Sequence, residues 1–117
     1  QWYVNEKDQL WLQVYQRSGD MFLGVPFNLF SYSVLVHMMA HLTKKQVGGL
    51  IHVLGDAHIY ENHVEVVHEQ LQRQTHPLPS FKVKDECNAQ QWEDFSLDSF
   101  ELVDYVCEGS LKAQMVA

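Results

Sequence analysis

The segment from Pro26 to about Leu42 constrains the fold of this chain most strongly. Its apolar residues recur at spacings of three and four, which predicts a helix. The opposite side of that helix is apolar as well, so the helix should be buried. A chain of 117 residues supplies few elements to cover it. We therefore expect the isolated chain to expose apolar surface around Val36 and not to fold stably.

Short β-favouring runs precede and follow this helix. Residues 1–4 and 10–15 predict two strands that pair as a hairpin through the polar residues 5–8. The Gly48 and Gly49 pair is expected to break the chain ahead of a buried strand over residues 50–54. Because a strand begins at residue 1 with no lead-in, we expect the natural chain to extend upstream.

The second half of the chain carries weaker signals. Residues 55–60 predict a polar loop, followed by a helix that Asn62 caps and that runs to about Gln74. Residues 81–83 and 100–103 predict two more strands. The inner face of the second helix is expected to carry Val64, Val67, His68 and Leu71, and Pro77 and Pro79 end the helix.

Charge and hydropathy exclude several classes of partner. The net charge is -7 and the eight Lys and Arg residues are scattered, which disfavours binding to nucleic acid. The longest apolar stretch, roughly 27–40, is broken by polar residues and is shorter than the ~20 residues that cross a bilayer, so no membrane partner is expected. The N-terminus has no secretory signal pattern, and a cytoplasmic location is the default. The two cysteines, Cys87 and Cys107, favour neither a disulfide framework nor a reactive nucleophile.

The richest polar cluster lies between Gln16 and Asn28. Arg17, beside an amide and a hydroxyl, could bind phosphate oxygens, although spacing alone favours an ion pair with Asp20. The Asn28 amide could read a ligand, although a cap for the buried helix is the commoner role. The candidate site residues of this cluster are Gln16, Arg17, Ser18, Gly19, Asp20 and Asn28.

Histidines suggest a second group of candidates. His58 and Tyr60 alternate near the end of a predicted strand and could both hydrogen-bond a sugar hydroxyl, although packing roles are the commoner outcome. His37 and His41 share a helical face, but no third ligand stands at a recognised spacing. No metal site is predicted.

Taken together, these segments resemble the thymidylate synthases. The matching segments are YQRSGD at 15–20, FLGVPFN at 22–28, SY at 31–32, VHMM at 36–39, GDAHIY at 55–60, NH at 62–63, PLP at 77–79 and KAQMVA at 112–117. They occur in the family's order and span the whole chain. The resemblance implies an α+β fold with a mixed sheet and a long buried helix. Residues 1–117 would be the C-terminal portion of a single domain, whose upstream portion is absent.

The resemblance also implies a reaction. It is the reductive methylation of dUMP to dTMP, in which 5,10-methylenetetrahydrofolate gives the one-carbon unit and the hydride and leaves as dihydrofolate. No metal takes part. A cysteine thiolate adds to C6 of the uracil and makes C5 nucleophilic. In the family that cysteine precedes the strand that opens here at Gln1, so we expect this chain alone to be inactive.

Residue by residue, the resemblance assigns roles to the candidates. Arg17 and Ser18 would hold the dUMP phosphate, with Gln16 and Gly19 close by. Asn28 would read the uracil edge, and His58 with Tyr60 would hold the ribose 3'-hydroxyl. Asp20 would bond the pterin of the folate, and Val116 would contact the folate as the C-terminal residues close over both ligands. The sheet would pack against a second subunit, giving a homodimer.

The resemblance has gaps, and other functions stay open. The segment 107–110 differs from the His-Pro stretch that commonly precedes the family's final Ile-Lys. The nucleophile, the general-base glutamate and an arginine pair that reaches the partner's phosphate all lie upstream in the family. A non-catalytic nucleotide-binding or dimerising module is one alternative. A dCMP hydroxymethylase is another, but a cytosine reader would be better served by a carboxylate in place of Asn28.

Overall fold

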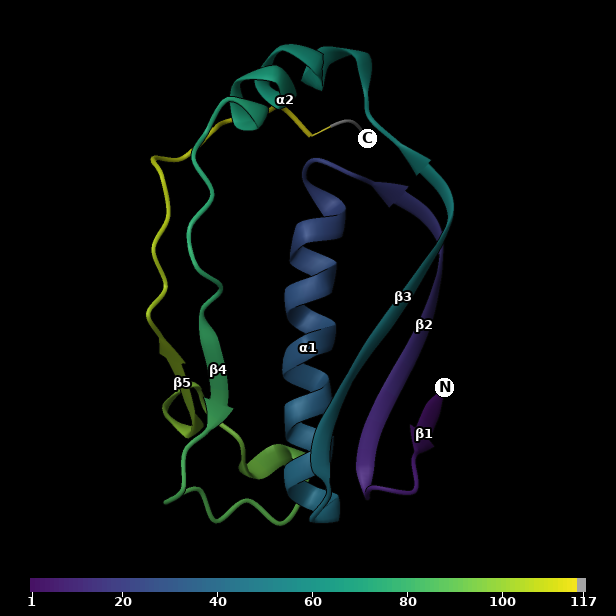
Figure 1. Cartoon of the computed structure of the whole chain (residues 1–117), viewed down its shortest axis with the longest axis vertical. Helices are drawn as coiled ribbons and strands as arrows, with labels where there is room; N and C mark the ends of the chain where they lie inside the picture. The colour runs from purple at the N-terminus through teal and green to yellow at the C-terminus, as the bar shows by residue number, and fades with distance from the viewer. Residues whose placement is uncertain (116–117) are drawn as a thin grey trace.

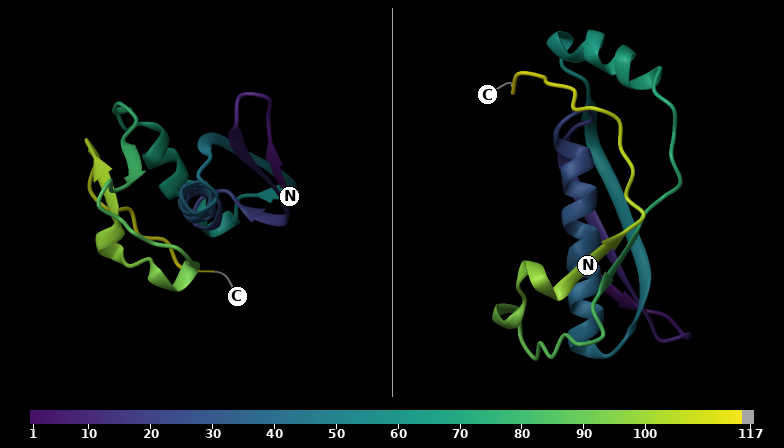
Figure 2. Two further views of the ribbon diagram at one scale, coloured as in Figure 1. Left: turned by 90° about the horizontal axis from the view of Figure 1, so that it is seen from below. Right: turned by 90° about the vertical axis from the view of Figure 1, so that its left-hand side faces the viewer.

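One long helix lies between two sheets in the computed structural model, which describes residues 1–115 (Figure 1). The first sheet has the order β1-β2-β3, and the second pairs β4 with β5. Seen along its axis, the helix α1 is covered by the first sheet on one side and by β4 and β5 on the other (Figure 2). The elements are β1 (Trp2–Val4), β2 (Gln9–Asp20), α1 (Gly24–Thr43), β3 (Gln46–His58), η1 (Glu61–His63), α2 (Val64–Leu71), β4 (Ser80–Val83), η2 (Trp92–Asp94), η3 (Leu97–Ser99) and β5 (Phe100–Val103). The α+β class expected from the resemblance is confirmed.

The predicted N-terminal hairpin is present. β1 and β2 pair antiparallel, with Tyr3 opposite Trp11. The Asn5 side chain shapes the turn, because its Oδ1 accepts hydrogen bonds from the backbone N–H groups of Lys7 and Gln9, each at 3.0 Å. Asp8 takes the left-handed conformation that this turn needs, with φ of 58°.

β3 is longer than predicted at both ends. It runs parallel to β2 from Gln46 to His58, so Gly48 and Gly49 lie inside a strand, and residues 55–58 extend it. The prediction of a break at the two glycines was therefore wrong, and the predicted loop over 55–60 is confined to residues 59 and 60. The reason is tertiary: a Cβ on Gly49 would lie 2.7 Å from the Trp11 ring, so glycine is needed where the indole of β2 crosses β3.

Gly48 is the extra residue of a β-bulge. The register passes from Leu10 opposite Val47 to Trp11 opposite Gly49, which leaves Gly48 without a partner on β2. From the bulge as far as Gln16 and Leu54, even-numbered residues of β2 pair with even-numbered residues of β3. They share the face of the sheet that carries the buried Leu10 and Leu12 and that packs against α1.

α1 follows the prediction closely but is better covered than expected. It begins two residues before Pro26 and ends at Thr43, after which Lys44 takes a left-handed conformation with φ of 56°. Val36 and Ala40 are each only 2% exposed. The second sheet supplies the missing cover, since the Phe81 ring lies 5.1 Å from the ring of His37 on α1. Apolar surface remains only toward the start of the helix, where Phe27 is 73% exposed.

On the side of α1 away from the first sheet, the predicted strands at 81–83 and 100–103 are confirmed as β4 and β5. Their aromatic rings stack, with Phe81 and Phe95 5.5 Å and 5.7 Å from Phe100. Lys82 Nζ lies 3.0 Å from Glu101 Oε2 across the pair, and this exposed contact raises the pKa of the lysine. These contacts hold the second sheet together over α1.

The second helix is shorter than predicted. Asn62 lies inside the turn η1 instead of capping, and α2 ends at Leu71 with no side-chain cap. The predicted inner face is also wrong, because α2 lies across one end of the molecule (Figure 1). Val67 alone of the four expected residues is half-buried; Val64, His68 and Leu71 are exposed. No helix within residues 1–115 is long and apolar enough to cross a membrane.

Candidate functional site

The candidate residues gather at one end of the first sheet. β2 and β3 are parallel, so both strands end at the same edge, with Asp20 opposite His58. The Met21 N–H donates to the His58 carbonyl at 2.9 Å and ties the two strand ends together. α1 begins at the same edge (Figure 1). A strand end, a second strand end and a helix start therefore converge, as they do at many ligand sites of parallel sheets.

Gln16 is the hub of a side-chain network at this edge. Its Nε2 donates to the Ser18 carbonyl at 2.8 Å and to Asn28 Oδ1 at 3.0 Å. Its Oε1 lies 2.7 Å from His52 Nε2. The His52 ring meets the ring of Tyr32 edge to face, 5.9 Å away. One glutamine thus joins β2, β3 and α1.

Asn28 does not cap α1. The helix starts at Gly24 and its N-cap residue is Leu23, so Asn28 lies in the second turn. The capping interpretation was wrong because Pro26, inside the first turn, is tolerated there and does not mark the helix start. The Asn28 Oδ1 accepts from Gln16, which leaves its amide N–H groups free for a ligand.

Asp20 organises the turn between β2 and α1. Its Oδ1 accepts hydrogen bonds from the backbone N–H groups of Phe22 at 3.1 Å and Leu23 at 3.3 Å. Within residues 1–115 the ion pairs do not include Arg17 with Asp20, so the pairing that spacing favoured is wrong. The turn uses one carboxylate oxygen and leaves the other for a ligand.

Arg17 and Ser18 are exposed near the end of β2. No carboxylate of the described chain lies within ion-pair distance of the Arg17 guanidinium. The Ser18 backbone carbonyl is used by Gln16, which leaves the hydroxyl available. Gly19 is buried between β3 and α1, where a Cβ would lie 3.1 Å from Leu54 and 3.2 Å from Val25. An exposed cation and an exposed hydroxyl thus follow one another in β2, next to a close strand-helix contact at Gly19.

His58 and Tyr60 lie side by side just beyond this edge. Their rings meet edge to face with centroids 4.9 Å apart. His58 Nδ1 lies 3.2 Å from the Asp56 carbonyl and 3.7 Å from its carboxylate. Packing and ligand binding both remain compatible with this arrangement.

His63 lies in one of the segments that match the family, but the sequence alone assigned it no role. It is fully buried, and its Nε2 donates to the Gln114 carbonyl at 2.8 Å. Its ring lies 5.7 Å from Phe22 and 5.6 Å from Tyr60. This contact fastens the C-terminal segment beside the site. The predicted folate contact, Val116, lies outside the described residues.

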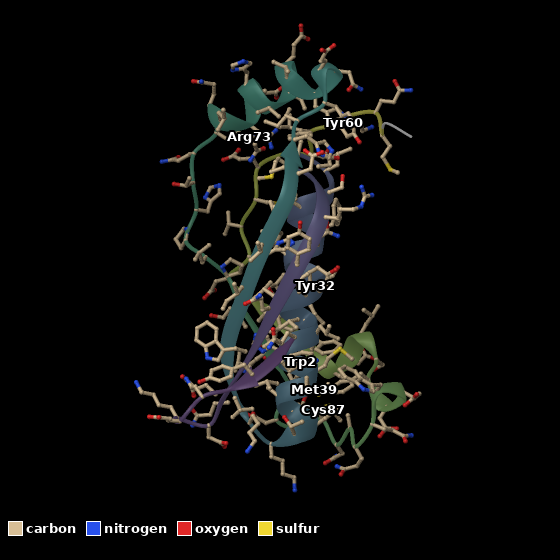
Figure 3. All side chains as sticks on the ribbon, turned by 90° about the vertical axis from the view of Figure 1, so that its right-hand side faces the viewer. Trp2, Tyr32, Met39, Tyr60, Arg73 and Cys87 are labelled. Carbon is tan, nitrogen blue, oxygen red and sulfur yellow. The ribbon has the colours of Figure 1, made fainter. Side chains whose placement is uncertain are left out.

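The remaining histidines and the cysteines lie elsewhere. His37 and His41 pack against Phe81 and Phe95, and burial lowers the pKa of His37. Within the described residues no group of three His, Cys, Asp or Glu could hold a metal ion. Cys87 lies at the opposite end of the molecule from Tyr60 (Figure 3).

The chain resembles known proteins along its whole length. The sequence model of the family described as Thymidylate synthase matches residues 1–117. The chain is 48% identical over 113 residues to the thymidylate synthase of Leuconostoc mesenteroides subsp. mesenteroides, covering 97% of this chain and 34% of that protein. It is 52% identical over 105 residues to the Mycoplasma genitalium thymidylate synthase, covering 90% of this chain and 35% of that protein.

Solved structures give the same result. The thermostable thymidylate synthase A from Bacillus subtilis matches with a TM-score of 0.86 at 37% identity, covering 96% of this chain and 39% of that one. The chain therefore spans a little more than a third of the length of the relatives that it matches.

Proposed function

Because this chain belongs to the thymidylate synthase family, we propose that it supplies the nucleotide and folate contacts of an enzyme that converts dUMP to dTMP. The co-substrate is 5,10-methylenetetrahydrofolate, which gives a methylene group and a hydride and leaves as dihydrofolate. The observation that carries the proposal is the hydrogen bond between Gln16 and Asn28, which orients a uracil reader beside Arg17 and Ser18.

The phosphate of dUMP binds at Arg17 and Ser18, with Gln16 and Gly19 alongside. The Arg17 guanidinium has no competing carboxylate within residues 1–115, so an anionic ligand can satisfy it. A guanidinium and a hydroxyl can bond phosphate oxygens from different directions.

Asn28 reads the uracil ring. Its amide N–H donates to O4, and the second lone pair of Oδ1 accepts the hydrogen of N3. Cytosine presents the reverse pattern at these two positions, so the site rejects dCMP. His58 and Tyr60, side by side at the end of β3, hold the ribose 3'-hydroxyl.

The folate binds against the turn that follows β2. The Asp20 oxygen that the turn leaves unused accepts from the pterin. The C-terminal segment, with Val116, then closes over both ligands and excludes water. The contact between His63 and Gln114 supports this closure, because it already holds the segment beside the site.

The nucleophile comes from a segment outside these 117 residues. A cysteine thiolate adds to C6 of the uracil, and C5 attacks the methylene group of the folate. Loss of the C5 proton expels the folate amine and leaves an exocyclic methylene, and hydride transfer from the folate to that carbon expels the thiolate and gives dTMP. Cys107 is exposed on the C-terminal segment and Cys87 lies far from Tyr60 (Figure 3), so neither serves this role. We expect the isolated chain to be inactive.

The enzyme acts as a homodimer in the cytoplasm. The face of the first sheet opposite α1 carries large apolar side chains that are exposed, namely Tyr3 at 61%, Tyr15 at 68%, Ile51 at 46% and Val53 at 40%. A second copy of the same face would bury them.

Tritium release from dUMP labelled at C5 tests the proposal in the full-length protein. Arg17→Ala removes a charge-assisted bond to phosphate, so kcat/KM should fall about tenfold to a hundredfold. Arg73→Ala is the matched control, since that arginine lies beyond α2 and pairs with Glu69. It should leave the rate unchanged. Release by the 117-residue chain alone would contradict the placement of the nucleophile.

A non-catalytic nucleotide-binding or dimerising module is the second candidate. Cys87 lies far from the site, and this favours a binding module over catalysis by this chain alone (Figure 3). Binding of dUMP by the full-length protein without tritium release would support the module.

A further inference from the structure

We propose that His52 is a positioning residue that fixes which atoms Asn28 presents to the pyrimidine, and so contributes to the choice of uracil over cytosine. The inference rests on the proposed function of Asn28. His52 does not touch the ligand in this scheme, because it acts through Gln16.

The Ser18 backbone carbonyl can only accept a hydrogen bond, so it determines the direction of the other hydrogen bonds in the network. The Ser18 backbone carbonyl lies 2.8 Å from one end of the Gln16 amide, so that end must be the N–H₂ group. The other end, Oε1, then points at His52 Nε2 at 2.7 Å. An oxygen cannot donate, so His52 must carry a hydrogen on Nε2.

The same reasoning orients Asn28. The Gln16 N–H₂ group also lies 3.0 Å from the Asn28 amide, and a donor there requires the Asn28 oxygen. The Asn28 nitrogen is thereby turned toward the ligand side. The pattern that results, a donor beside an acceptor, is the one that matches O4 and N3–H of uracil.

His52 stabilises this orientation of the Gln16 and Asn28 amides through its hydrogen bond to Gln16 Oε1. With its Nε2–H in place, rotation of the Gln16 amide would bring two donors together at His52 and two acceptors together at Ser18. The imidazolium form also carries a hydrogen on Nε2, so the polarity is the same in either charge state. The edge-to-face contact with Tyr32, one turn after Asn28 on α1, holds the His52 ring in place.

Without the His52 donor, the half-buried Gln16 Oε1 loses its partner. The amide of Gln16 can then rotate at a lower cost, and a rotated Gln16 would draw the Asn28 nitrogen toward itself. Asn28 would present the reverse pattern, which suits cytosine. A single lost hydrogen bond is worth about three- to tenfold in relative affinity.

The test measures the affinities of dUMP and dCMP by calorimetry in the full-length protein. His52→Phe keeps a ring against Tyr32 and removes the donor, so the preference for dUMP over dCMP should fall about three- to tenfold. His52→Gln can donate from a similar position and should restore the preference. His37→Phe is the matched control, because that half-buried histidine contacts Phe81 on the other side of α1 and should leave the preference unchanged.

The outcomes separate the two proposals. If His52→Phe weakens both nucleotides equally, or leaves their ratio unchanged, His52 has only a structural role and the inference is wrong. A glutamine variant that behaves like the phenylalanine variant would also overturn it. If the unmodified protein does not prefer dUMP, the proposed role of Asn28 fails first, and the inference fails with it.

Discussion

The hydrogen bond between His63 and Gln114 predicts that a substitution of His63 loosens the C-terminal segment without a matching change in the stability of the whole protein. His63→Phe removes the hydrogen bond from Nε2 to the Gln114 carbonyl. It keeps a ring of similar size between Phe22 and Tyr60.

Two effects oppose each other. Losing the bond to Gln114 costs about 1 kcal/mol, the net worth of an ordinary hydrogen bond. The other ring nitrogen, Nδ1, is buried with no hydrogen-bond partner in the described residues. An unpaired buried group costs about 1–3 kcal/mol, and phenylalanine removes that cost. We therefore expect the melting temperature of the full-length protein to change by no more than about 4 °C in either direction.

The C-terminal segment should respond differently, because it loses the bond and gains nothing. Losing about 1 kcal/mol of attachment energy makes the detached state of the segment about fivefold more populated. Lys112 lies two residues before Gln114, so limited trypsin digestion followed by intact mass measurement reports this opening. Cleavage after Lys112 should be about fivefold faster in His63→Phe, and KM for the folate should rise.

His68→Phe provides the control, since His68 is exposed on α2 and makes no hydrogen bond or ion pair in the described residues. It should change neither the melting temperature nor the cleavage rate. A drop of several degrees in His63→Phe with unchanged cleavage after Lys112 would refute the reasoning, because it would mean that His63 stabilises the core and not the segment.

Two further predictions concern packing and pH. Gly49→Ala places a Cβ 2.7 Å from the Trp11 ring, so the free energy of unfolding measured with denaturant should fall by about 1–3 kcal/mol; an unchanged value would show that the indole moves aside freely. Burial lowers the pKa of His37, so the folded state binds this proton less readily than the unfolded state. Stability should therefore fall as pH drops through about 6.5, the ordinary value, and His37→Phe should remove that part of the fall; identical pH profiles in the two proteins would contradict it.

The elements that sequence predicted well have local causes. The apolar periodicity of α1 gave its extent within two residues at the start, and the polar turn at Asn5 to Asp8 gave the hairpin. Helix periodicity and turn chemistry are properties of neighbouring residues. They need no knowledge of the rest of the fold.

The errors have tertiary causes. Gly48 and Gly49 look like a break because the local chain offers no reason for them, but Trp11 lies across both from another strand. Gly55 is a similar case, since a Cβ there would lie 2.6 Å from the Tyr15 hydroxyl. In each position a side chain of β2 requires the glycine of β3, and nothing within β3 reveals it.

The residues of the candidate site likewise fall into two groups, those that the sequence indicated and those whose partners are distant along the chain. Gln16 and Asn28 were predicted as site residues from their order along the chain, and the structure joins them directly. His52 and His63 were given no role from the sequence, because their partners lie 36 and 51 residues away along the chain. Only the fold brings such partners together.

The bulge at Gly48 connects the fold to the site. Upstream of it Leu10 pairs with Val47, and continued pairing without an extra residue would set His52 opposite Tyr15, on the outer face of the sheet. The bulge shifts β3 by one residue, so that His52 pairs with Val14 and faces α1, as Gln16 does. Because side chains alternate with period two, this single unpaired glycine determines whether the imidazole can reach Gln16 at all. The glycine that looked like a chain break in the sequence therefore determines which side chains of β3 face α1, and the Gln16 network depends on that choice.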